Sequence, residues 1–344
     1  MKKSRRVALR INVVLLSMLM VLTLIPVGAL ELLPITGDAD GFYHHDYTTG
    51  ETDFIAWSEV PQYDYTCTYD CLDAEIVAQC QAIDAQYFAA LRTEQSAAVV
   101  QTLTDSSPYT TVHPYGGTDY LYSGVVLIVA IAEQFGQSTP ISVGSGFVVG
   151  GDVVLTAAHV TLSDSFTISE IRVYPGVDHD ADFWGDGLEN YSYYTITNCY
   201  RGTNTQSNAV EDPENDWCIA IADGLSDHDE FLYNFNCYSV NSSIIGTQTY
   251  AVGYPNTQSY RMAESSGYVY SMLDSTNRVL LNTNPSNAGM SGGPLYAHVG
   301  GRSAIAINSF YIPPEDTETE YGAGGGPLFT STLLNLVYDA ILEN

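Results

Sequence analysis

Beyond Thr104 the chain is a series of short apolar runs, interrupted at close intervals by Gly, Asn, Asp and Pro. Examples are GVVLIVAIA, ISVGSGFVV, DVVLTAAHV and IIGTQTYAVGY. Runs of this length and spacing predict strands joined by turns, and many of them in succession predict an all-β sandwich or barrel. A stretch of roughly 230 residues is long enough for one compact all-β unit or for two packed small barrels.

Helical patterns lie on either side of this β-rich part. Apolar positions recur at steps of three and four from Ile76 to Leu91, which predicts a helix over about 72–103 within a distinct N-terminal region, residues 30–107. Residues 104–117 have the composition of a linker. A second apolar pattern predicts a C-terminal helix over 332–342, with Ser331 as its N-cap.

The first 29 residues have the features of a targeting signal. Basic residues precede an apolar run that Pro26 interrupts, and residues 27–29 offer the small side chains of a cleavage site. We therefore expect a signal peptide over 1–29 and a secreted, extracellular protein. The alternative is a membrane-anchored cell-surface protein, because the apolar run is almost long enough to span a bilayer.

Removing this signal leaves six Arg, no Lys and 40 acidic residues, which gives a formal net charge of −34. Nucleic acids and anionic lipids are bound through basic surfaces. We therefore expect no nucleic-acid partner, no membrane partner after signal removal, and a monomer.

The chain has six cysteines in two groups of three: Cys67, Cys71 and Cys80, then Cys199, Cys218 and Cys237. Disulfides are expected in an exported chain, but the sequence alone does not choose among the pairings. If all six cysteines pair, at least one bridge must join the two groups. The alternative is a zinc site that combines the first group with His44 or His45.

The stretch NAGMSGGPLY places Ser291 among three glycines. A serine hydroxyl becomes a useful nucleophile only when a neighbouring base takes its proton. Glycines let the backbone turn tightly enough to present two N–H groups to the oxyanion that forms on attack. The amides of Gly289 and Ser291 are the expected pair.

Two further motifs supply the partners that such a serine needs. His159 ends the run GDVVLTAAHV, which predicts that its ring is held at the end of a strand. Asp216 immediately precedes the apolar run Trp217–Ala222, so its carboxylate is expected at the rim of a core. A histidine can accept the serine proton, and a buried carboxylate orients the histidine and stabilises its charged form.

The motifs TAAHV, NDWCIAIA and GMSGGPL, in the order His, Asp, Ser, resemble the chymotrypsin-like serine proteases. GSGFVVGGDVVLTAAHV, VYPGV, VGYP and the short C-terminal end are similar to the bacterial V8-like glutamyl endopeptidases. The resemblance covers about residues 108–344. It implies an all-β fold of two packed antiparallel six-stranded barrels with a C-terminal helix, barrel 1 over about 118–235 and barrel 2 over about 240–330.

The resemblance also implies a secreted serine endopeptidase that hydrolyses proteins or peptides through an acyl-enzyme. His159, Asp216 and Ser291 would be catalytic, Gly289 and Ser291 would form the oxyanion hole, and Ser309 would support the aspartate. Residues 30–107 would then be the pro-segment of a zymogen or an appended module. The alternative function is a protease-like binding or surface-adhesion module without catalysis.

Three positions depart from the family patterns. Asn308 stands where glutamyl members have a histidine, and Pro285 stands where trypsin-like members have an acid. We therefore assign Asn308 and Ser309 to substrate binding without a preferred P1 residue. Met290 precedes the nucleophile, where trypsin-like members have an aspartate that captures the new N-terminus, so that activation switch cannot operate here.

No cofactor and no catalytic metal are expected. The segment Asp178–Glu189 has carboxylates at positions 1, 3, 5, 9 and 12 of an EF-hand spacing, so a structural Ca²⁺ is the alternative. Phe183 occupies the position that requires glycine in such a loop, which argues against calcium.

Overall fold

The apolar runs form strands in a computed structural model, which describes residues 41–63, 67–96, 108–114, 120–134, 136–177, 188–272, 278–312 and 323–344. The expected signal peptide and residues 178–187 of the expected calcium loop lie outside the described residues. The described residues all belong to one unit, Ala39–Asn344.

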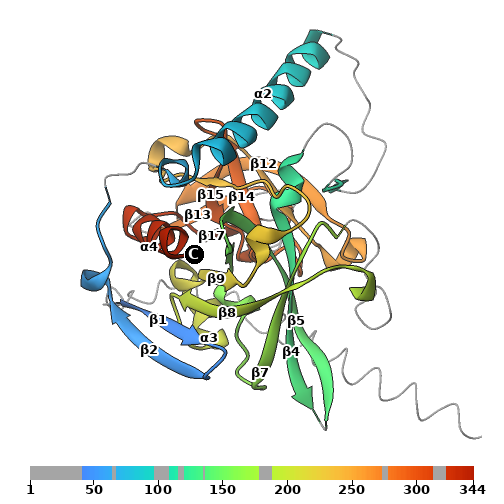
Figure 1. The fold of residues 1–344 in the computed structure, drawn as a ribbon. Coiled ribbons are helices and arrows are strands. Elements are labelled where there is room, and N and C mark those ends of the chain that lie inside the picture. Colours follow the sequence, from blue (N-terminus) through green and yellow to red (C-terminus); the bar gives the residue numbers. More distant parts are fainter. Residues whose placement is uncertain are drawn as a thin grey trace, which may run out of the picture. The chain divides into compact units, whose positions relative to one another are not determined.

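The first group of strands comprises β4 (Val125–Gln134), β5 (Gln137–Gly150), β6 (Val153–Thr156), β7 (Ile168–Pro175), β8 (Tyr194–Arg201) and β9 (Cys218–Ala222). They pair antiparallel in the order β8-β7-β4-β5-β6-β9, and β9 also pairs with β8. This last pairing closes a six-stranded barrel, as the resemblance implies (Figure 1). All five residues of β9 are buried, which explains why this strand is continuously apolar.

The second sheet comprises β3 (Thr110–Thr111), β10 (Asn236–Cys237), β11 (Gln248–Gly253), β12 (Ala263–Met272), β13 (Val279–Asn282), β14 (Pro294–His298), β15 (Arg302–Ile307), β16 (Phe310–Ile312) and β17 (Ala323–Pro327). Its main path is β10-β15-β14-β11-β12-β13-β17-β16, and β3 pairs with β12. An isolated bridge between Ala306 in β15 and Leu328, just after β17, joins the two ends of a second six-stranded ring.

The α-helices among the described residues are α2 (Ala74–Ser96), α3 (Gln206–Glu211) and α4 (Ser331–Glu343). Helix α4 agrees with the predicted span within one residue, but its N-cap is Thr330 rather than Ser331. The Thr330 hydroxyl accepts the N–H of Leu333 at 3.1 Å. No helix in the described part of the chain is long and apolar enough to cross a bilayer.

Helix α2 begins later than the predicted residue 72, because the Asp73 side chain accepts the N–H of Glu75 at 2.7 Å and starts the helix there. The predicted stretch from 97 to 103 lies outside the described residues.

The N-terminal region adds a hairpin to the first barrel. Strands β1 (Gly41–Asp46) and β2 (Glu51–Ala56) pair antiparallel, and β1 pairs in turn with β8 (Figure 1). Phe42 in β1 is buried, and its ring centroid lies 4.8 Å from that of Trp57 and 6.4 Å from that of Trp217. The hairpin therefore extends the barrel sheet and covers the residue that follows Asp216.

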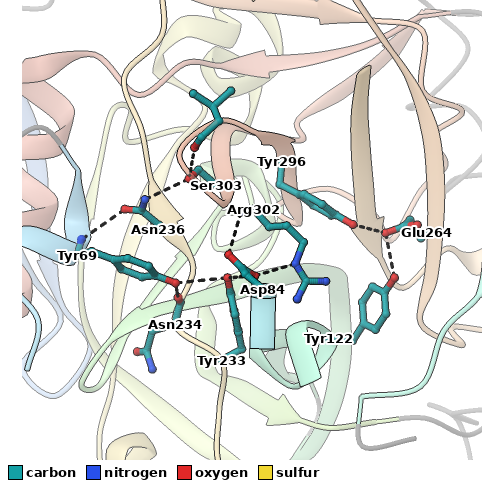
Figure 2. Close-up of polar contacts among 11 residues, drawn as sticks. Tyr69, Asp84, Tyr122, Tyr233, Asn234, Asn236, Glu264, Tyr296, Arg302 and Ser303 are labelled. Atoms are coloured by element: carbon teal, nitrogen blue, oxygen red, sulfur yellow. Dashed lines mark hydrogen bonds and ion pairs between the residues drawn. The ribbon is translucent and has the colours of Figure 1, made fainter. Parts of the chain in front are cut away.

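Helix α2 meets the second sheet through a buried polar network (Figure 2). Asp84 forms an ion pair with Arg302, with 2.8 Å between Oδ1 and Nε, and accepts the backbone N–H of Arg302 at 3.0 Å. The Tyr233 hydroxyl donates to the same carboxylate at 3.0 Å. The side chain of Arg302 is fully buried, so the N-terminal region supplies the counter-charge for an interior cation.

All six cysteines are free thiols in the structure, so the expected disulfides are not formed there. The described residues contain no group of three His, Cys, Asp or Glu side chains placed to hold a metal. The two histidines of the alternative zinc site lie on β1, where His44 stacks on Tyr200 and His45 Nδ1 lies 2.7 Å from Thr52 Oγ1.

Candidate active site

His159 lies in a single 3₁₀ turn, Ala158–Val160, that directly follows β6. Both neighbours of His159 in the turn are buried, while its own side chain remains 20% exposed. The buried neighbours fix the backbone at the strand end and leave one side of the ring accessible. The strand-end position that the sequence predicts for His159 is therefore observed.

Asp216 holds both the backbone and the ring of His159. One carboxylate oxygen, Oδ1, accepts the His159 N–H at 2.9 Å, and the other, Oδ2, lies 2.7 Å from ring atom Nδ1. The Ser309 hydroxyl donates to Oδ2 as well. The Asp216 side chain is 1% exposed, so these contacts supply the polar partners that a buried carboxylate requires.

Two opposing effects act on the protonation of His159. Burial lowers the pKa of the imidazole, whereas the charge of Asp216 and its hydrogen bond to Nδ1 raise it. The net result is a pKa raised above the ordinary value of 6.5. A base of this kind accepts a proton readily near neutral pH.

The loop around Ser291 is built on glycines with left-handed backbones. Gly289 has φ +95° and Gly292 has φ +90°. A Cβ on Gly289 would lie 2.2 Å from the carbonyl oxygen of Tyr254, so no other residue fits there without a shift of the backbone. Within the described residues, the backbone N–H groups of Gly289 and Ser291 donate to no acceptor, which leaves both for an oxyanion.

Ser309 connects Asp216 to Ser291 through two hydrogen bonds. Its hydroxyl donates to Asp216, and its carbonyl oxygen accepts the Ser291 hydroxyl at 3.4 Å. In the part of the chain that the structure describes, no hydrogen bond joins Ser291 directly to His159. The predicted residues are thus gathered at one place, with the serine hydroxyl turned toward Ser309.

Ser145 in β5 is a site residue that the sequence analysis missed. Its hydroxyl donates to the Gly289 carbonyl at 2.7 Å and accepts the N–H of Tyr254 at 2.9 Å, while its own N–H donates to the Ser291 carbonyl at 2.7 Å. Ser145 is fully buried and ties residues 287–293, named here the nucleophile loop for the role proposed below, to the first barrel. A lone serine between glycines in GSGF gives no sequence signal of this role.

Asn308 contacts the nucleophile loop through both its backbone and its side chain. Its N–H donates to the Gly293 carbonyl at 2.9 Å, and its carbonyl accepts the Gly292 N–H at 2.6 Å. Its Nδ2 donates to the Met290 carbonyl oxygen at 3.1 Å and to Ser286 Oγ at 2.9 Å. These contacts direct the side-chain amide of Asn308 toward the loop. The prediction that Asn308 binds substrate is therefore revised below.

The fold and the site together resemble the chymotrypsin-like serine proteases. The chain has a closed β-barrel beside a second six-stranded ring, and it has a His–Asp pair near a glycine-flanked serine. Residues 144–307 match the trypsin-like peptidase domain family, and this range contains His159, Asp216 and Ser291. The match supports a serine protease. No curated protein gives a match.

Several solved structures are similar to this chain at low sequence identity. A Glu endopeptidase in complex with MPD is 18% identical, with a TM-score of 0.48, over 68% of this chain and 96% of that one. The serine endoprotease from Yersinia pestis is 17% identical, with a TM-score of 0.41, over 65% and 64%. The Rv3671c protease from M. tuberculosis, in its active form, is 16% identical, with a TM-score of 0.42, over 70% and 94%.

Proposed function

We propose that this chain is a secreted serine endopeptidase that cleaves peptide bonds in proteins or peptides through an acyl-enzyme. The observation that carries the proposal is the convergence at Asp216. Its carboxylate orients His159 at 2.7 Å and accepts the hydroxyl of Ser309, whose carbonyl holds Ser291.

In the proposed reaction, His159 takes the hydroxyl proton of Ser291 as the serine oxygen attacks the scissile carbonyl. The C–O bond forms, and the carbonyl electrons move to oxygen, where the N–H groups of Gly289 and Ser291 stabilise the negative charge. His159 then gives its proton to the leaving amine as the C–N bond breaks. Water hydrolyses the acyl-enzyme by the same steps, with His159 as base and then as acid.

The direct test is the variant Ser291→Ala, in which no nucleophile remains. We expect it to abolish hydrolysis of casein while the fold is retained, measured by release of soluble peptides and by circular dichroism. Ser242→Ala is a matched control, because Ser242 is exposed on a surface turn. Casein hydrolysis by the purified Ser291 variant at the wild-type rate would contradict the proposal.

A catalytically silent binding or adhesion module is the second candidate, and one observation favours it. The Ser291 hydroxyl donates to Ser309 rather than to His159. Rotation of the serine side chain is enough to change this partner, and catalytic hydrogen bonds in ligand-free enzymes are often not formed. Labelling of the wild-type protein with a fluorophosphonate decides between the two, because only an activated serine reacts.

Secretion and the monomeric state are part of the same proposal. Fractionation of a culture of the source cells should place the protein in the supernatant, whereas a surface-anchored protein would stay with the cells. Size-exclusion chromatography of the supernatant protein measures the oligomeric state.

A further inference from the structure

The Met290 carbonyl oxygen, in the peptide unit between Met290 and Ser291, accepts two hydrogen bonds. One comes from the Gly293 N–H at 3.1 Å, and the other comes from the side chain of Asn308, the residue after β15. Asn308 Nδ2 donates to the Met290 carbonyl oxygen at 3.1 Å. A carbonyl oxygen can only accept, so the NH₂ end of the amide must face Met290. The second Nδ2 proton is directed to Ser286 Oγ at 2.9 Å, so both side-chain donors of Asn308 are used within the protein.

This contact controls where an oxyanion donor points. A peptide unit is planar and trans, so its C=O and its N–H point in opposite directions. Holding the Met290 carbonyl therefore also fixes the direction of the Ser291 N–H. The Gly289 N–H belongs to the peptide unit whose carbonyl, on Ala288, accepts a backbone N–H from Asn256 at 2.8 Å.

We propose that Asn308 is a positioning residue that, together with the Gly293 N–H, holds the Met290–Ser291 peptide unit and so orients the oxyanion hole, a role that rests on the proposed function. It acts through the backbone of the loop and does not contact the substrate. Asn308 is 2% exposed, and a side chain with both donors engaged has no N–H to offer to a P1 side chain.

The test uses Asn308→Leu and Asn308→Asp, two variants of similar size that lack a side-chain N–H donor. Loss of the Asn308 donor leaves the Gly293 N–H as the remaining partner of the Met290 carbonyl, so the peptide unit is held less firmly. Small misplacements of catalytic groups lower rates by about 10- to 100-fold. We expect kcat for a peptide amide to fall in this range while KM changes little. Ser286→Ala, which removes only the other acceptor, should leave kcat close to that of the wild type.

A second readout separates this role from a structural one. A peptide boronic acid mimics the tetrahedral intermediate, and its affinity should fall by about the same factor as kcat in both Asn308 variants. Thermal unfolding verifies that each variant is folded. A raised KM with unchanged kcat would overturn the proposal in favour of substrate contact, and unchanged kcat and boronate affinity would overturn it outright. A wild-type protein inert to fluorophosphonate would instead overturn the proposed function.

A separate observation concerns the N-terminal segment, defined here as residues 41–96. It shares buried polar contacts with the second sheet at Asp84 and Arg302 (Figure 2). It also inserts Thr68, whose hydroxyl accepts the backbone N–H of Cys237 at 2.8 Å within the interior. Removing the segment would strip the Arg302 guanidinium of its carboxylate, and breaking such a pair is strongly destabilising.

We infer that the N-terminal segment is a permanent part of the folded enzyme and is not released as a pro-segment. The test replaces residues 97–107 in the full chain with the recognition sequence of a site-specific protease and cuts there. We expect residues 41–96 to co-elute with the remainder in size-exclusion chromatography and the cut enzyme to keep its activity. Release of the segment together with loss of activity would also support the inference, because a pro-segment leaves an active enzyme when it is removed.

Release of the segment with full activity left in the remainder would overturn it. Asp84→Asn removes the charge with little change in shape, so more of the segment should dissociate after cutting. Asp73→Asn is the matched control, because Asp73 is exposed and Asn can cap the helix equally well.

Discussion

At His159, burial and the charge of Asp216 act on the same ring in opposite directions. The charge of Asp216 and its hydrogen bond to Nδ1 together outweigh burial, because Oδ2 lies only 2.7 Å from Nδ1. In the proposed reaction, the neutral imidazole is the form that accepts the serine proton. The protonation state of this one ring would therefore determine the pH range of the proposed activity.

We expect kcat/KM to fall as the pH drops through a pKa above 6.5, because protonated His159 cannot act as base. The same pKa can be measured without turnover by NMR titration of the ring in the Ser291→Ala protein. Adding Asp216→Asn removes the charge that raises the pKa and leaves burial, so the midpoint should move below 6.5. A midpoint that does not change would contradict the assignment of Asp216 as the partner.

The positions of the single residues in the candidate site were unequally visible in the sequence. The grouping of His159, Asp216 and Ser291 at one place could be predicted, because each chemical type occurs in a distinctive local context and in a known order. Ser145 and the contacts of Asn308 could not, because they depend on which backbone groups approach from distant strands. A hydrogen bond between residues 145 and 289 leaves no trace in either local stretch.

At the scale of elements, the β1–β2 hairpin is attached to the first barrel by backbone pairing and by one buried ring. Phe42 is 1% exposed and packs among Trp57, Tyr200 and Trp217. Period-two patterns predict strands, but they do not predict which strand an N-terminal hairpin joins. In the structure β1 pairs with β8, and Phe42 packs beside Trp217.

We expect Phe42→Ala to lower the free energy of unfolding by about 3–5 kcal/mol, the usual cost of deleting a buried phenyl ring. Phe54→Ala is the matched control, because Phe54 lies on the other strand of the hairpin and is 52% exposed. Urea denaturation followed by tryptophan fluorescence measures both. Equal effects of the two substitutions would show that the hairpin does not pack on the barrel core.

At the scale of the whole molecule, the sequence predicted the fold class and the C-terminal helix, because turn spacing and helical periodicity are local signals. The closure of the first barrel by β8 and β9 follows from long-range pairing and was available only through resemblance. The sequence did not predict that residues 41–96 pair with β8 and form a buried ion pair with β15. Asp84 and Arg302 are 218 residues apart, and nothing near either residue indicates its partner.

Hydrogen bonds from two parts of the molecule hold the nucleophile loop. One comes from Ser145 in the first barrel, and the other comes from Asn308 at the end of β15 in the second ring. A small relative displacement of the two halves would therefore pull the anchor points of one short turn apart. The rate of the proposed reaction would then depend on how the first barrel and the second ring are placed relative to each other. Substitutions between the barrel and the ring would change that rate without replacing any residue that reacts.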